Sequence, residues 1–270
     1  MATEVTDRPI GETRTLSTAD GGTALSTTLA LIPIPPRVSR LIIIPRNFAT
    51  AVVAKFALNP YLVVLKTLDN LATATDYSEA AQDADTATDI DLSSLDTAAN
   101  GDYLYVGSHQ RFRGVRVDVD AANGNASTLT VNYWNGTAWV TITATDGSAS
   151  GGATIAVDGN VTWTVPAAWV AASLEDIASP VPGSIVPYKD LKLYWTRWQV
   201  SAALDATSTL NSMLSLNRNT AQYAELLATT ALDERIKRGL GGIACVEALT
   251  DGGTANLIVN GVMSAEEFYA

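Results

Sequence analysis

The sequence predicts a mainly β fold, an antiparallel β-sandwich or jelly roll, and three observations support that class. Apolar and polar residues alternate along residues 115–119, 129–133 and 161–165, which is typical of strands with one buried face. Asn135-Gly136 separates two such runs, and this dipeptide favours hairpin turns because both residues tolerate positive φ. Threonine suits a pleated surface, and the frequent asparagine and glycine suit tight turns.

The length and charge of the chain limit what it can be. A chain of 270 residues can bury a substantial core, as one large domain or two smaller ones. The formal net charge is −11, and clustered basic side chains of the kind that displace counterions from nucleic acid are missing. We therefore expect no nucleic-acid partner. Cys245 is the single cysteine, so stability must come from packing or assembly.

No segment of the sequence is typical of a membrane protein. The most apolar stretch, residues 48–65, is interrupted by Lys55 and by Asn59-Pro60, which favours buried strands over a membrane span. A basic segment followed by an apolar one is not found at the start, so no signal peptide is expected. These patterns predict a protein made in a reducing cytoplasm, without a membrane partner.

The first half of the chain is predicted to contain two segments. Residues 1–25 are polar and aperiodic, and we expect them to form an extended N-terminal arm. A neighbouring subunit is expected to hold the arm, the alternative being an arm folded back on its own domain. Residues 26–100 are predicted to be β-rich, with prolines at strand ends or edges. The acidic stretch 69–99 is expected to be a long surface loop.

The second half is predicted to contain two more segments. Residues 101–217 are expected to be the β-sandwich core module, because the alternating runs are concentrated there. Residues 218–270 are expected to add a short helix and a terminal β-hairpin that pack on the sandwich. The helix is predicted over residues 221–239, where apolar residues recur at near-helical spacing and basic residues precede a glycine. The hairpin turn is predicted at Asp251-Gly252.

The sequence predicts no catalytic, cofactor or metal site, and we expect the protein not to be an enzyme. His109 is the only histidine, in a turn-like segment that has no recognisable catalytic partner. Residues 239–244 match the pattern G-x-G-x-x-A. A helix is expected before this pattern and a strand after it, the reverse of the order that binds a dinucleotide. One histidine and one cysteine are too few for a transition-metal site.

Two runs of oxygen-bearing side chains leave a calcium site open as an alternative. Calcium needs several oxygen ligands that converge on one point, and neither run has the spacing of an EF-hand loop. Solvated acidic loops are the more frequent outcome. The residues are Asp83, Asp85, Asp89 and Asp91 in the first run and Asp118, Asp120, Asn123 and Asn125 in the second.

The tryptophans could contact a carbohydrate or a protein partner, and Trp134, Trp139 and Trp198 are the candidates for such contacts. The competing interpretation makes them core or hairpin residues, as aromatic residues in sandwiches most often are. Trp134 and Trp139 flank the Asn-Gly turn and could pack on each other. Trp195 and Trp198 lie on opposite faces of one expected strand, so that sheet should fully bury at most one of them.

A longer pattern runs through the predicted sandwich. It consists of a YW-G-W hairpin, a D-G-V-W-P-W strand pair and a YW-R-VS strand, in that order. The residues are Tyr133, Trp134, Gly136, Trp139, Asp158, Gly159, Val161, Trp163, Pro166, Trp169, Tyr194, Trp195, Arg197, Val200 and Ser201. This pattern, which covers less than half of the chain, resembles a β-sandwich module of virion proteins from tailed bacteriophages.

The resemblance implies a non-enzymatic structural component of a bacteriophage particle, made in the host cytoplasm and located in the virion. The leading hypothesis is a capsid decoration or head-stabilising protein, assembled in many copies through its arm and sheet edges. Its expected partners are the major capsid protein or neighbouring copies. A homo-oligomer such as a trimer would cover edge strands that otherwise aggregate. The alternative is a tail, baseplate or fibre-associated protein whose sandwich binds host carbohydrate.

Overall fold

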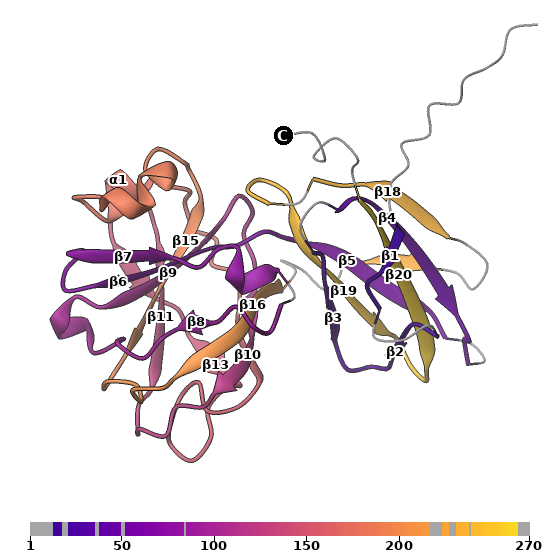
Figure 1. The fold of residues 1–270 in the computed structure, drawn as a ribbon, viewed down its shortest axis with the longest axis horizontal. Coiled ribbons are helices and arrows are strands. Elements are labelled where there is room, and N and C mark those ends of the chain that lie inside the picture. The colour runs from indigo at the N-terminus through magenta and orange to yellow at the C-terminus, as the bar shows by residue number, and fades with distance from the viewer. Residues whose placement is uncertain are drawn as a thin grey trace, which may run out of the picture.

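A computed structural model describes residues 13–17, 21–35, 38–49, 52–83, 85–216, 223–226, 231–237 and 239–263. The described chain is mainly β, and its antiparallel strands form two lobes that lie side by side (Figure 1). Residues 62–216 form what we call the central lobe. Residues 13–60 and 223–263, from both ends of the chain, form the terminal lobe. The predicted class, a mainly β protein built from antiparallel sandwiches, is confirmed.

The central lobe is a sandwich of two antiparallel sheets. The larger sheet has the order β12 (Trp139–Thr141), β11 (Leu129–Trp134), β15 (Tyr194–Val200), β9 (Tyr103–Ser108), β6 (Val63–Leu68) and β7 (Thr73–Asp76). The smaller sheet has the order β13 (Ala144–Asp146), β14 (Gly159–Trp163), β10 (Gly114–Ala121), β16 (Thr209–Leu216) and β8 (Ile90–Asp91). The helical turns of this lobe are η1 (Ala80–Gln82), η2 (Ala98–Asn100), α1 (Leu174–Ile177) and η3 (Gly183–Tyr188).

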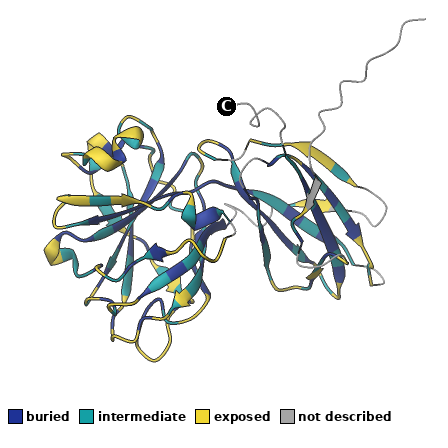
Figure 2. Cartoon of the chain, in the orientation of Figure 1, coloured by how far each residue is buried: buried dark blue, intermediate teal, exposed yellow. Residues whose placement is uncertain are grey.

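The core between these sheets is built from alternating residues, as the sequence predicts. Val115 and Val117 of β10 are buried in one cluster with Val131 of β11. Buried stretches lie along the strands of this lobe, and exposed ones lie mostly at its periphery (Figure 2). Trp163 of β14 and Trp198 of β15 meet inside the same cluster, with ring centroids 6.4 Å apart in a T-shaped arrangement. Such pairs add stability beyond that of the buried area alone.

The outer face of the larger sheet is also covered, which the sequence does not predict. Leu174 of α1, Ile185 of η3 and Leu193 form a second buried cluster with Trp195 on this face. Trp195 and Trp198 are therefore both buried, with 0% and 1% of their surface exposed, although they lie on opposite faces of β15. The expectation from the sequence limits only what the sheet itself can bury; Trp195 is buried by these outer residues instead.

The terminal lobe is a second sandwich with its own apolar core. One sheet has the order β1 (Thr13–Thr15), β20 (Ala255–Met263), β4 (Val38–Arg46) and β18 (Leu232–Arg235), with β2 (Thr23–Leu25) also paired to β20. The other has the order β17 (Ala224–Leu226), β5 (Ala54–Pro60), β19 (Ile243–Thr250) and β3 (Ala30–Pro33). Ile32, Leu41 and Val259 are buried in the core between them.

The described part of the predicted arm folds back on its own chain. β1 and β2 both pair with β20, and Leu25 is buried in the core of the terminal lobe. The structure thus supports the less favoured alternative for residues 13–17 and 21–25, because β20 gives their backbone groups partners within the chain. Residues 1–12 lie outside the described residues.

The predicted C-terminal elements are wrong in two respects. In place of a helix over residues 221–239, the described part contains β17 and β18, which pair with β5 and β4. A turn is present at Asp251-Gly252, but it connects β19 and β20, which belong to opposite sheets and are not a hairpin. Pairing with strands distant in sequence outweighs local preference in both places.

The domain boundaries also differ from the predicted ones. The chain leaves the terminal lobe after Pro60, so the predicted segment 26–100 is split between the lobes. The described residues between Tyr223 and Met263 complete the terminal lobe, and they are not an addition to the central sandwich. The predicted acidic loop, residues 69–99, is anchored in the central core by Ile90, Leu92 and Leu95, so it is exposed only in part.

Replacing Gly107 with alanine should destabilise the central lobe. Gly107 pairs with Trp195 across the sheet, and a Cβ atom there would lie 2.5 Å from Cε3 of the indole. Because the covered indole has no room to move, we expect Gly107→Ala to lower the free energy of unfolding by about 1–3 kcal/mol. Urea unfolding followed by tryptophan fluorescence measures this. The matched control is Gly183→Ala, where a Cβ atom meets nothing within 4 Å; equal losses would contradict the role of Gly107.

Candidate functional site

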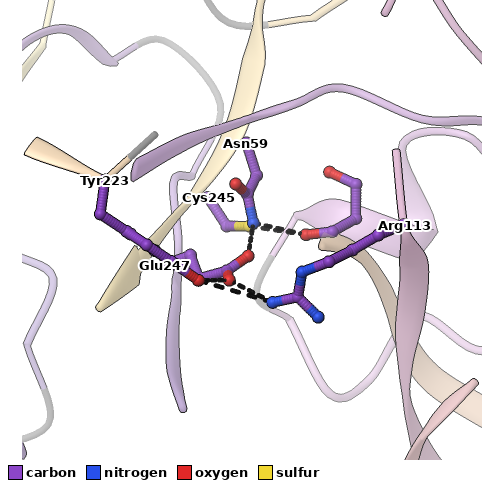
Figure 3. Close-up of polar contacts among 6 residues, drawn as sticks. Asn59, Arg113, Tyr223, Cys245 and Glu247 are labelled. Carbon is purple, nitrogen blue, oxygen red and sulfur yellow. Dashed lines mark hydrogen bonds and ion pairs between the residues drawn. The ribbon is translucent and has the colours of Figure 1, made fainter. Parts of the chain in front are cut away.

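The two lobes meet on the outer face of the four-stranded sheet of the terminal lobe. Val246 and Ala248 of β19 point into the terminal core, so Glu247 between them points toward the central lobe. Asn59, near the end of β5, lies beside Glu247. Arg113 reaches the same place from the central lobe (Figure 3). The Ser215 carbonyl oxygen, from the same lobe, contacts Asn59.

Glu247 is the centre of a hydrogen-bonded cluster at this junction. Its Oε1 accepts hydrogen bonds from Arg113 Nη2, at 2.6 Å, and from the Tyr223 hydroxyl. Its Oε2 accepts from Asn59 Nδ2 at 2.5 Å, and the same nitrogen donates to the Ser215 carbonyl oxygen at 2.6 Å. Figure 3 shows these groups converging on the carboxylate from both lobes. The cluster therefore joins the lobes through a charge pair and neutral donors.

The ion pair at the centre is largely removed from water. The Glu247 side chain is 0% exposed and the Arg113 side chain 21% exposed. Burying a carboxylate costs several kcal/mol of hydration energy, which only a charge partner and hydrogen bonds can offset. The pKa of Tyr223 is raised, first by burial and then by its hydrogen bond to Glu247. The hydroxyl therefore keeps its proton and remains a donor to the carboxylate.

Cys245 and His109 do not form a catalytic pair. Burial raises the pKa of the Cys245 thiol, and its Sγ lies 3.8 Å from the Ser215 carbonyl oxygen. A thiol that stays protonated is a poor nucleophile. The His109 ring lies 3.0 Å from the side-chain nitrogen of Gln110, and burial lowers its pKa. Across the described ranges, no nucleophile or carboxylate lies within hydrogen-bonding distance of His109.

A pocket of about 410 Å³ adjoins the junction cluster, on the outer face of the same sheet. Arg113 and Tyr223 of the junction cluster belong to its lining. Two of its lining residues are cations, two are leucines and two carry hydroxyl groups. They are Thr27, Leu29, Lys55, Arg113, Tyr223 and Leu249.

The structure separates the three tryptophans that the sequence proposes as contact residues. Trp198 is 1% exposed inside the core, so it cannot contact a carbohydrate or a partner. Trp134 and Trp139 are half-buried and pack on each other across their hairpin, with centroids 5.5 Å apart. The guanidinium carbon of Arg197 lies 4.8 Å from the Trp139 ring centroid and 4.3 Å from that of Tyr103. Much of the Trp139 face is thus occupied by the protein itself.

The remaining sequence candidates do not assemble into a site. Residues 239–244 form a turn that leads into β19, and a strand in place of a helix excludes the dinucleotide arrangement. In the calcium runs, Asp91 pairs with Lys66 at 3.4 Å, and the Asn123 amide bonds to its own loop. Within the described part of the chain, no three His, Cys, Asp or Glu side chains are grouped to hold a metal. No helix among those residues is long and apolar enough to cross a membrane.

Sequence reasoning missed the junction cluster. The sequence does contain one kind of signal for it, a polar residue within or at the end of an apolar run. Glu247 interrupts one such run, and Asn59-Pro60 ends another. A charged residue inside a buried run suggests a paired charge, but the partner cannot be named without the fold. Arg113 and Tyr223, separated by 110 residues, carry no such signal.

Comparison of the chain with protein-family models, curated proteins and solved structures finds no match.

Removing the cation of the junction should cost more than removing a cation of a surface pair. Arg113→Met leaves the buried Glu247 carboxylate without its charge partner, and we expect the free energy of unfolding to fall by about 3–5 kcal/mol. Adding Glu247→Gln should recover part of the loss, because the carboxylate is then gone. Urea unfolding followed by circular dichroism, which reports on both lobes, measures each variant.

The matched control is Lys189→Met. Lys189 and Glu175 form an ion pair at 3.1 Å, with side chains 39% and 55% exposed. Water screens such an exposed pair, so this variant should unfold nearly like the parent. A loss in Arg113→Met no larger than the loss in Lys189→Met would contradict the importance of the junction pair.

Proposed function

We propose that the protein is a non-enzymatic structural component of a bacteriophage particle, and that it decorates or stabilises the head. The observation that supports the proposal most is that tryptophans of the sequence pattern shared with virion proteins are buried in the core of the central lobe. Trp163, Trp169 and Trp195 belong to that pattern, and all three are buried, as is Trp198 on the same strand as Trp195. The pattern therefore specifies a packed building block and not a set of reactive groups.

The polar atoms of these tryptophans support the same interpretation. Each indole N–H donates to an acceptor inside the central lobe at 3.0–3.1 Å, so none is left to recognise a ligand. The acceptors are the carbonyl oxygens of Phe112, Trp195 and Ala172 and the Thr196 hydroxyl. Satisfied buried polar groups favour one rigid arrangement.

Two further features suit a protein that is present in many copies. The charge of −11 keeps a concentrated protein soluble and discourages non-specific association. The edge strand β18 carries the exposed residues Asp233, Glu234 and Arg235, and charges on an edge oppose uncontrolled pairing of sheets. Assembly would then depend on specific contacts, for which residues 1–12 are our candidate.

The carbohydrate-binding alternative has less support. It needs an aromatic face open to solvent, whereas Trp198 is buried and Trp139 is covered by Arg197. Trp134 is the remaining candidate, and its ring packs against Trp139. The role of the sandwich as a building block needs none of these faces to be free.

Removing residues 1–12 should abolish association with the particle while leaving both lobes folded. The truncation stops before β1, because Thr13–Thr15 pairs with β20 and belongs to the fold. Purified phage particles that lack the protein are incubated with the full chain or the truncated chain, and co-sedimentation is measured. Circular dichroism checks that the truncated chain has the strand content of the parent.

Replacing residues 1–12 with a Gly-Ser segment of the same length is the matched control for chain length. It should fail to bind like the truncation. Binding that survives both changes would remove the arm from the proposal. If the full chain were absent from purified virions and also failed to bind particles, the proposal of a structural role in the particle would be contradicted.

A further inference from the structure

The pocket beside the junction combines two cations with apolar walls. Lys55 of β5 and Leu249 of β19 are paired across the sheet, and Leu29 lies just before β3. Arg113 and Tyr223, from the junction cluster, also line the pocket. Its volume of about 410 Å³ lies within the usual range for small-molecule sites.

The charges of the pocket leave a positive excess. Arg113 is balanced by the buried carboxylate of Glu247. Lys55 makes no ion pair within the part of the chain that the structure describes. The residue opposite it in β17 is Glu225, which is exposed and does not line the pocket, so water screens its charge from Lys55. The chain has only 17 lysines and arginines against 28 acidic residues, so two cations in one pocket are a notable concentration.

Arg113 also has unused hydrogen-bonding capacity. Only Nη2 bonds to Glu247 and Tyr223, and Nη1 makes no hydrogen bond among the described residues. Nε is buried, so Nη1 is the donor that a molecule in the pocket could reach. A guanidinium with free donors beside an ammonium group is a typical carboxylate-binding arrangement.

We infer that this pocket binds a small organic monocarboxylate with an apolar body. The carboxylate would accept hydrogen bonds from Lys55 and from the free donors of Arg113, and the body would lie against Leu29 and Leu249. One negative charge matches the excess. A dianion would bring more negative charge than the lining cations leave unbalanced, and a neutral molecule would leave Lys55 unpaired. The inference does not depend on the proposed role in the particle.

Benzoate is the probe, and benzamide is its uncharged counterpart of the same shape. In an NMR titration of the ¹⁵N-labelled full chain, benzoate should shift the amide signals of Lys55 and Leu249 in a saturable way at constant ionic strength. Benzamide should bind at least about tenfold more weakly, because it lacks the charge-assisted hydrogen bonds. Equal binding of the two probes would overturn the assignment.

The variant Lys55→Met keeps the aliphatic stem and should weaken benzoate binding about tenfold or more. Lys192→Met removes one charge from an exposed position of the central lobe, outside the pocket lining, and should leave binding unchanged. Equal affinities in the parent and Lys55→Met, or equal losses in both variants, would contradict the site. The last titration uses a synthetic peptide of residues 264–270, SAEEFYA, in place of benzoate. Tighter binding of the peptide than of benzoate at the same signals would reassign the pocket to a protein segment.

Discussion

A carboxylate with no access to water is the constraint on which the two-lobed arrangement depends. Glu247 lies on a strand of the terminal lobe, and the cation that pairs with it, Arg113, belongs to the central lobe. If the lobes separated, the cluster would be exposed to water and its hydrogen bonds would be lost. If they docked differently, a charge would be buried without a partner, at a cost of several kcal/mol. The pair therefore specifies how the lobes dock, whatever its net contribution to stability.

The chain topology makes this docking effective. The central lobe is inserted into the sequence of the terminal lobe. The chain leaves the terminal lobe after Pro60, the last residue of β5, and it has returned to that lobe at Tyr223, just before β17. Both of these ends contribute to the junction. The Pro60 carbonyl oxygen accepts a hydrogen bond from the Ser215 hydroxyl at 2.5 Å, and Tyr223 donates to Glu247. Two connections, each with a hydrogen bond at its junction end, restrict rotation of one lobe against the other more than a single linker would.

The sequence correctly predicts the elements that depend on a local pattern of residues. It fails where pairing with strands distant in the sequence determines the structure. The alternation of Val115, Val117 and Val131 correctly gives strands and core residues, because a period of two appears directly in the sequence. The region 221–239 has near-helical spacing, yet β17 and β18 form there as edges of existing sheets. Likewise, Trp195 is buried by residues 174–193, which no property of its own strand indicates. The candidate site joins residues from five separate segments, so only Glu247 was detectable, as a charge within an apolar run.

The junction and the pocket share Arg113, and this links binding to docking of the lobes. Nη2 of Arg113 is used by Glu247, whereas Nη1 makes no hydrogen bond among the described residues. A carboxylate in the pocket would engage donors that the ion pair leaves free, so it would add to the cluster without competing with Glu247. It would also contact Lys55 of the terminal lobe and Arg113 of the central lobe at once. Since only the docked arrangement brings these two cations together, any ligand that needs both must favour the docked lobes, and its binding energy would appear as resistance to their separation.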